Sequence, residues 1–228
     1  MRFFNLDSPL MSALSRLADL MILNLLVLIF CIPVITIGPA ITAMHFVLLK
    51  MVRKEECYII APFFKSFKEN FRQTSISGLI IIAVVFIYVI DLRILNEAEF
   101  EYASWLLIAL YACGIIGSMT LMYVFPLFAR FNNTIWGTFK NALYMSILNL
   151  PRTVLMILAC ILPVLFTAMS ATMFPILFLV GISGPAYLCA MLYSNTFKRF
   201  EPEEVQIDAD AWSVDAVGDS DIETRDDE

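Results

Sequence analysis

The sequence predicts an all-α protein, a polytopic transmembrane helix bundle of about five spans with an amphipathic helix at the cytoplasmic interface. Of its 228 residues, 60% are hydrophobic and 16% are charged, whereas a soluble domain has about 45–50% apolar and 25% charged residues. Its mean hydropathy is +0.81. Several stretches approach the roughly 20 apolar residues that a helix needs to cross a hydrocarbon core of about 30 Å. Lipid is therefore the predicted solvent of the membrane domain, residues 1–200.

Five segments approach the length of a transmembrane helix. The last two share an uncharged stretch between Arg152 and Lys198, which is too long for one span and about right for two. A region rich in Ser, Thr and Pro, from Thr167 to Pro175, is the predicted turn between them. The predicted spans are residues 17–37, 74–95, 103–129, 153–170 and 173–195.

The first span has an alternative. Residues 20–49 carry no formal charge and are interrupted at Pro33, Gly38 and Pro39, so they also suit two short spans. Each half would hold about 15 residues, fewer than the roughly 20 that a span needs. Proline is tolerated within membrane helices. We therefore predict one kinked helix.

Basic residues orient the spans, because Lys and Arg accumulate in loops that stay in the cytoplasm. The loop between the first two predicted spans, the loop between the third and fourth, and the start of the tail are all rich in Lys and Arg. These segments, and with them the C-terminus, are predicted to be cytoplasmic in a cell (inner) membrane, with the N-terminus outside. Arg2 and Arg16 oppose that placement of the N-terminus. No cleavable signal peptide is expected.

Residues 62–72 separate into two faces at the helical period. Aromatic side chains occupy one face and cations the other, which suits a helix in the cytoplasmic interface with its cations near anionic lipid headgroups. An aromatic face packed against the bundle explains the pattern equally well. The aromatic face holds Phe63, Phe67 and Phe71, and the basic face holds Lys65, Lys68 and Arg72.

The last 28 residues, Glu201 to Glu228, hold 12 of the 21 acidic residues. The rest of the chain has 14 basic and 9 acidic residues and is therefore positively charged. The tail has too little apolar surface to fold alone. Residues 201–228 are predicted to form a disordered acidic tail. Solvated disorder is the default for such a tail, and folding back on the basic face or recruiting a basic partner are the alternatives.

Few polar residues lie within the predicted spans, and such residues are functional candidates because lipid makes their burial costly. Asn24 suits a hydrogen bond between helices or a position along a pathway. His45, the only histidine, suits a partly buried interfacial side chain better than a metal ligand, since no further ligand stands at the required spacing.

Two short sequences repeat within the chain. Gly38-Pro39-Ala40 and Gly184-Pro185-Ala186 are each followed at the same distance by an Arg and a Glu. Transporters use such broken-helix repeats to form binding sites at the membrane midplane, but a kink near the cytoplasmic interface is the simpler interpretation.

No catalytic, cofactor-binding or metal-binding residues are predicted. The five cysteines, of which Cys31, Cys160 and Cys189 lie in apolar runs, form no C-x-x-C pair, which disfavours a disulfide framework and a zinc site. No nucleotide-binding or hydrolase motif occurs. The predicted partners are the lipid bilayer and its anionic headgroups, with a sugar-uptake permease or a second copy of the chain as further candidates, and no nucleic acid.

The N-terminal third resembles the YesL-like family of bacterial membrane proteins. The resemblance is most specific over residues 3–73 and extends to about residue 198. It is carried by Phe4-Asn5, Asp7-Ser8-Pro9, Leu14-Ser15-Arg16, Ala18-Asp19-Leu20, Leu23-Asn24-Leu25, Thr36-Ile37-Gly38-Pro39-Ala40, Val52-Arg53, Glu55-Glu56, Phe63-Phe64, Ser66-Phe67-Lys68, Asn70-Phe71, Asn149-Leu150-Pro151-Arg152 and Gly184-Pro185.

This resemblance implies an integral membrane protein of unassigned biochemical function, from a family often encoded beside carbohydrate uptake and degradation systems. It supplies no catalytic or binding residues. The Glu-Ala-Ala loop through which sugar permeases engage their ATPase is missing, which argues against a permease. The leading hypothesis is an accessory or regulatory component, ahead of a small transporter or channel component, with a membrane enzyme third.

Overall fold

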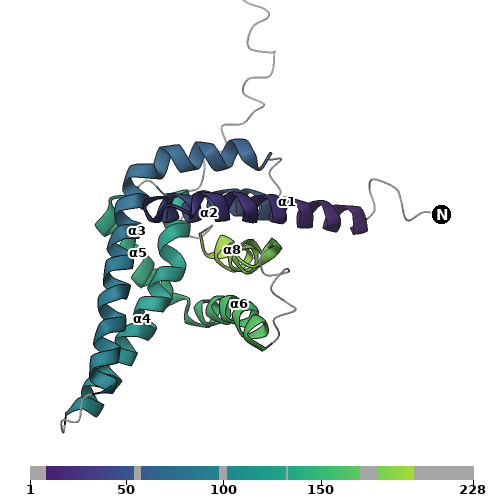
Figure 1. The fold of residues 1–228 in the computed structure, drawn as a ribbon. Helices are drawn as coiled ribbons and strands as arrows, with labels where there is room; N and C mark the ends of the chain where they lie inside the picture. Colours follow the sequence, from purple (N-terminus) through teal and green to yellow (C-terminus); the bar gives the residue numbers. More distant parts are fainter. Residues whose placement is uncertain (1–8, 54–57, 98–101, 132, 170–178, 198–228) are drawn as a thin grey trace, which may run out of the picture. The chain divides into compact units, whose positions relative to one another are not determined.

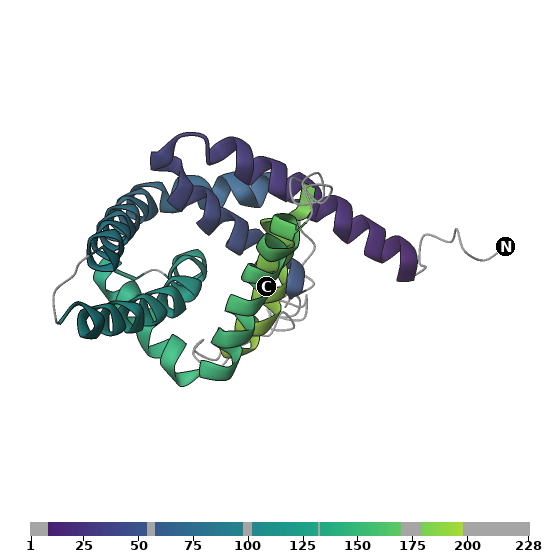
Figure 2. The same ribbon diagram turned by 60° about the horizontal axis from the view of Figure 1, so that its bottom comes forward.

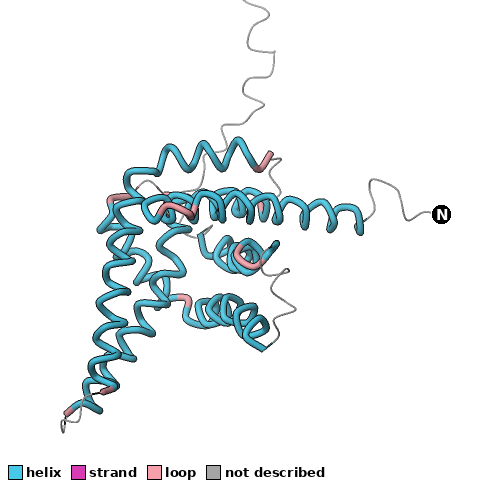
Figure 3. The backbone as a smooth tube through the Cα atoms, in the orientation of Figure 1, coloured by secondary structure: helices cyan, strands magenta, loops and turns pink. Residues whose placement is uncertain are grey.

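The computed structural model describes residues 9–53, 58–97, 102–131, 133–169 and 179–197. Every regular element in these ranges is helical, as Figure 3 shows, so the predicted all-α class is confirmed. Among these residues, 9–194 belong to one compact unit and 195–197 to another. The elements are α1 (Pro9–Phe30), η1 (Val34–Thr36), α2 (Ile37–Val52), α3 (Ile60–Asn96), α4 (Ala103–Arg130), α5 (Ile135–Leu148), α6 (Leu150–Met169) and α8 (Ser183–Phe197).

Three stretches are long and apolar enough to cross a membrane, namely Val34–Val52, Ile60–Asn96 and Ser104–Arg130. A fourth is added if α5 and α6, which meet at an angle of 101°, count as one bent span. These helices agree with a helical membrane bundle, although the prediction of about five spans is higher than the three or four found in the described residues. The predicted fifth span, residues 173–195, lies partly outside the described residues, and α8 has only 15 residues.

Two helices, α1 and α2, share the uncharged stretch of residues 20–49, for which one kinked first span, residues 17–37, was predicted. α1 ends at Phe30, and α2 begins at Ile37 after the short η1 helix. Proline fixes its own backbone, lacks an N–H and restricts the residue before it, so Pro33 favours a break. The Thr36 hydroxyl donates to the carbonyl oxygens of Phe30, at 2.6 Å, and Pro33, at 2.7 Å. The single kinked helix was therefore wrong, and the alternative of two helices was nearer the structure.

The predicted interfacial helix and second span form one helix, α3, which has 37 residues. Figure 1 shows α3 changing direction before it continues beside α4. Where the two predicted segments meet, at residues 72–77, side chains bond to the preceding turn: Thr74 Oγ1 donates to the Asn70 carbonyl at 2.7 Å, and Ser77 Oγ donates to the Gln73 carbonyl at 2.9 Å. Such bonds to the i−4 carbonyl often bend helices, which accounts for one helix serving both predicted segments.

The helices of residues 9–194 pack around buried hydrophobic side chains such as Leu23, Val47 and Tyr123, with buried polar side chains among them. α2 contacts α3 and α4, and α5 contacts α4. α3 and α4 run alongside each other, as do α6 and α8, in both Figure 1 and Figure 2. In contrast, the apolar window of α4 is 0% buried and that of α3 is 6% buried. These helix faces present apolar side chains outward, as expected for surfaces in contact with lipid.

Candidate functional site

Asn24 joins α1 to the start of α8. Its side chain is fully buried, and its Oδ1 accepts hydrogen bonds from the backbone N–H groups of Ile182 and Ser183, both at 3.1 Å. The Ser183 hydroxyl donates in return to the Leu20 carbonyl at 2.8 Å. The first N–H groups of a helix have no partner within the helix. Asn24 therefore serves as a cap supplied by another helix, which is the interhelical role expected for a polar residue in a span.

The two Gly-Pro segments occupy the same position in different helices. Gly38 and Pro39 are the second and third residues of α2, and Gly184 and Pro185 are the second and third residues of α8. Proline is tolerated in the first turn because its missing N–H would have had no intrahelical partner. The structure therefore corrects the prediction that these segments kink a continuous span: each one begins a helix.

Gly38 has a packing role that Gly184 does not share. A Cβ atom at position 38 would overlap the Thr74 carbonyl oxygen and lie 2.9 Å from its carbon, so α2 and α3 touch through their backbones. Gly78 faces Gly38 from α3, and a Cβ there would lie 3.3 Å from the Gly38 Cα. Small residues permit this close approach of helices. At Gly184 an added Cβ would meet only the Val180 side chain, at 3.0 Å.

His45 contacts Tyr193 across α2 and α8. Its Nδ1 lies 3.0 Å from the Tyr193 hydroxyl, and the two rings meet edge to face with centroids 5.8 Å apart. The structure thus brings His45 and the α8 helix together, as it does Asn24 and α8. Among the residues that the structure describes, no group of three His, Cys, Asp or Glu side chains could hold a metal ion.

The aromatic face of the first part of α3 packs mainly against the end of α1. The Phe30 ring centroid lies 5.9 Å from that of Phe63, 5.4 Å from that of Phe64 and 5.1 Å from that of Phe67. Phe63 is fully buried, whereas Phe71 is 37% exposed. The sequence left two interpretations of this aromatic face, insertion into the membrane interface or packing against the bundle. Phe63 packs against the bundle.

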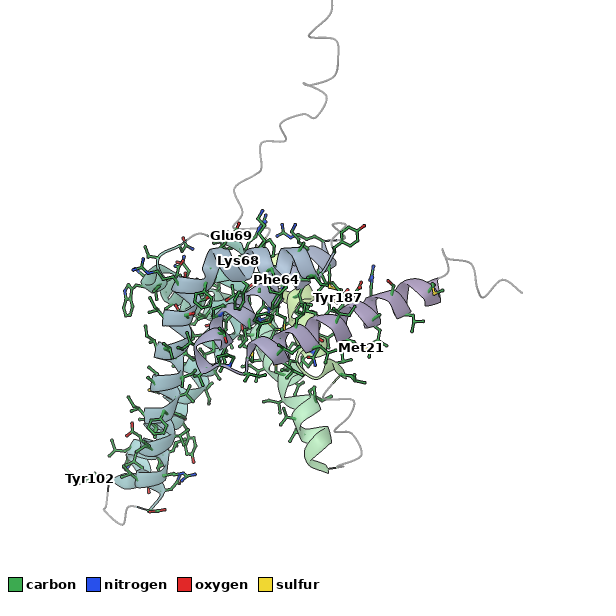
Figure 4. The ribbon with its side chains drawn as sticks, turned by 45° about the horizontal axis from the view of Figure 1, so that its top comes forward. Met21, Phe64, Lys68, Glu69, Tyr102 and Tyr187 are labelled. Atoms are coloured by element: carbon green, nitrogen blue, oxygen red, sulfur yellow. The ribbon has the colours of Figure 1, made fainter. Side chains whose placement is uncertain are left out.

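The basic face of the same helix is exposed at Lys65, Lys68 and Arg72. Figure 4 shows Lys68 and its neighbour Glu69 on the outer side of α3, with Phe64 nearer the other helices. Contact between these cations and anionic lipid headgroups remains a prediction.

Sequence reasoning missed two contacts of α6. Thr153 Oγ1 lies 3.3 Å from the Tyr123 hydroxyl and donates to the Ser146 carbonyl at 3.0 Å, which joins α4, α5 and α6. Cys160 of α6 and Cys189 of α8 have sulfur atoms 3.8 Å apart. The sequence held no signal for either pair, because each joins residues about 30 positions apart without any motif.

The fold and its contacts define a helical membrane protein in which the polar candidates of the spans join one helix to another. Residues 20–92 match the family described as "Protein of unknown function, DUF624". The chain is also 26% identical over 186 residues to the "Uncharacterized protein YesL" of Bacillus subtilis (strain 168), which covers 81% of this chain and 85% of that protein. No solved structure matches. These similarities support a YesL-like family of unassigned function, and the resemblance predicted from the sequence is confirmed.

The family match covers part of the candidate positions. Residues 20–92 include Asn24, Gly38, Pro39 and His45, together with the aromatic and basic faces of α3. Gly184 and Pro185 lie beyond the match. The α8 partners of Asn24 and His45 therefore also come from outside the matched residues.

Proposed function

We propose that this chain is a non-catalytic accessory or regulatory membrane protein that works beside a carbohydrate uptake or utilisation system. The observation that most supports this proposal is the hydrogen bonding of the Asn24 side chain. Asn24 is a polar candidate for a pathway, but its acceptor oxygen is instead engaged by two backbone N–H groups at the start of α8. A side chain that holds two helices together in this way suits a packed scaffold better than a site that binds and releases a transported substrate.

Two further polar contacts between helices, one of them at the candidate His45, support the same proposal. His45 pairs with Tyr193, and Thr153 pairs with Tyr123, in each case between two helices. The link to carbohydrates rests on the resemblance to the YesL-like family, and the site itself adds nothing to it. Function has to be argued from a site, so the experiment must identify the partner directly.

The acidic tail supplies the sharpest test of this proposal, because 12 acidic residues within 28 positions would attract a basic partner surface. The tagged full chain is isolated from its own membranes in mild detergent, and co-purifying proteins are identified by mass spectrometry. We expect a sugar-uptake permease component to be recovered. A variant with every Asp and Glu of residues 201–228 changed to Asn or Gln should release it.

A matched control keeps the tail charge but reverses the order of residues 201–228, and it should retain the partner if charge alone attracts it. The accessory role is refuted if no uptake component exceeds the level recovered with an unrelated membrane protein of the same tag. Retention by the uncharged tail would refute the role of the tail and leave the accessory role in place.

A small transporter or channel component is the second candidate, and the separate α1 and α2 helices around the break at Pro33 favour it. The purified full chain is placed in liposomes, and the flux of a labelled oligosaccharide and of monovalent ions is measured. Flux well above that of protein-free liposomes would support the transporter and refute a purely accessory role.

A further inference from the structure

Two cysteine side chains meet where α6 lies beside α8. The Sγ atoms of Cys160 and Cys189 are 3.8 Å apart, which is van der Waals contact, and both thiols are free. A disulfide has an S–S bond of about 2.05 Å. The two sulfur atoms therefore need to approach by less than about 2 Å to form one.

The thiol contact lies near the middle of both helices. Cys160 is the eleventh of the 20 residues of α6, and Cys189 is the seventh of the 15 residues of α8. Cys189 Sγ also lies 3.7 Å from the Met156 carbonyl oxygen, so this side chain reaches the α6 backbone. Ala186 and Ala190 flank Cys189 on α8 and are buried. Small residues permit a close approach of helices, so forming the bond requires little movement of α6 and α8.

The two thiols differ in exposure. Cys189 is buried, whereas Cys160 is half-buried. The α6 side chains Ile161, Leu162 and Val164, which follow Cys160, are exposed and apolar, as expected of a helix surface in lipid. Redox-sensing cysteines are accessible and often stand next to a second cysteine that resolves them. An oxidant that approaches from the lipid therefore meets Cys160 first, and Cys189 is placed to resolve it.

The apolar surroundings of the pair select the class of oxidant. An isolated charge is costly to bury in such surroundings, so the electrons and the protons of the two thiols have to leave together. Quinones dissolve in the hydrocarbon phase and take up two electrons with two protons, and they are the final acceptors of dithiol oxidation in the bacterial periplasm. A water-soluble oxidant such as oxidised glutathione does not enter the hydrocarbon phase.

We propose that Cys160 and Cys189 form a redox switch, in which a membrane quinone oxidises the pair to a disulfide that fixes α8 to α6. Both S–H bonds break and one S–S bond forms, while the two electrons and two protons pass to the quinone, which leaves as the quinol. A dithiol reductant reverses the reaction by two thiol–disulfide exchanges. The inference rests on the contact between α6 and α8 and is independent of the proposed function.

The disulfide acts on the helix that holds the partners of two candidate residues. Asn24 of α1 accepts from the first N–H group of α8, and His45 of α2 contacts the same helix at Tyr193. Thr153 joins α6 to α4 and α5. A covalent bond between α6 and α8 therefore couples α1 and α2 to α4 and α5 for as long as the pair is oxidised.

The test follows the thiols of the full chain in liposomes. The reduced protein is placed, without oxygen, in liposomes that contain a naphthoquinone or none, and free thiols are tagged with a maleimide after unfolding in detergent. We expect the quinone to abolish tagging of Cys160 and Cys189 and to leave Cys113, an exposed thiol of α4, tagged. Dithiothreitol should restore both tags. A cross-linked peptide pair in the mass spectrum distinguishes the disulfide from a quinone adduct.

Thermal unfolding measures whether the disulfide fixes α8. The bond would close a loop between residues 29 positions apart, and it should raise Tm by about 5–10 °C for a loop and a chain of these lengths. Cys160→Ser removes the half-buried thiol and should abolish the shift on addition of the quinone. Cys113→Ser is the matched control and should shift as the wild type does. A helical circular dichroism spectrum confirms that each variant is folded.

Four results would overturn the proposal. Cys160 and Cys189 could stay tagged in the presence of the quinone, or Cys113 could lose its tag as fast as they do, which would make the oxidation unspecific. Oxidised glutathione in the water phase could act as fast as the quinone, which would exclude oxidation from the lipid. A disulfide that forms without raising Tm would show that it does not fix α8.

Discussion

Substituting Gly38 with alanine tests the closest helix contact in the structure. The added methyl group would overlap the Thr74 carbonyl oxygen and lie 2.9 Å from its carbon, where ordinary contacts are 3.4–4 Å. Both atoms belong to the α3 backbone, which no side-chain rotation can move. We therefore expect α2 and α3 to separate.

The expected loss in the free energy of unfolding follows from the separation of α2 and α3. A gap of about 0.5–1 Å forfeits a quarter to a half of the dispersion energy between the atoms concerned, and overpacking a protein interior costs about 1–3 kcal/mol. Because the atoms that the methyl group would meet belong to the backbone, we expect the free energy of unfolding to fall by about 2–3 kcal/mol, near the upper part of this range. For a chain of 150–250 residues each kcal/mol lowers Tm by about 2–4 °C. Gly38→Ala should therefore lower Tm by about 4–12 °C.

The assay is thermal unfolding of the detergent-purified chain, followed by circular dichroism with reheating to check reversibility. Gly117→Ala is the matched control, because a Cβ at position 117 would have nothing within 4 Å, and its Tm should stay within about 2 °C of the wild type. Gly114→Ala should fall between them, since its Cβ would meet only the movable end of the Tyr88 side chain. Equal shifts for Gly38→Ala and Gly117→Ala would refute the backbone contact.

Two further substitutions and one cross-linking experiment test other helix contacts. Asn24→Leu leaves two backbone N–H groups at the start of α8 without their acceptor and should cost about 1–3 kcal/mol in the same unfolding assay; no loss would mean that α8 is capped otherwise. Cys160 and Cys189, with sulfur atoms 3.8 Å apart, should form a disulfide when membranes are treated with copper phenanthroline, detected by protection from a maleimide mass tag; continued labelling of both thiols would contradict the α6–α8 contact. Phe30→Ala removes a half-buried ring in contact with three others and should cost about 2 kcal/mol, less than a fully buried ring, measured against Leu14→Ala at an exposed site of the same helix.

The fold class was predictable because hydrophobicity and helix length act locally. The third predicted span, residues 103–129, differs by one residue from α4, Ala103–Arg130. A charge or a change of polarity bounds this helix at both ends, and such boundaries can be read directly from the chain. The helical spacing of aromatic and basic residues within residues 62–72 can also be read from a short segment. This helix and its aromatic face were therefore predictable as well.

Breaks in the helices were less predictable, because a proline alone does not decide them. Pro126 and Pro163 lie inside α4 and α6, which continue through them, whereas the chain leaves the helix before Pro33. In lipid a carbonyl that loses its helical partner must find another donor, and Thr36 provides one for Phe30. The same residue type therefore lies within a helix in one place and follows the end of a helix in another, depending on nearby donors.

Partners of the candidate residues required tertiary structure. Asn24 was identifiable as a candidate because a buried amide in lipid must be satisfied, but its partners lie 158 and 159 residues further along the chain. They are backbone N–H groups, which every residue except proline possesses, so no side chain in the sequence could indicate them. The same reasoning applies to Gly38, whose opposing atom is a carbonyl oxygen. Where a membrane protein joins its helices through the backbone, the sequence reveals one side of each contact, and only the fold reveals the other.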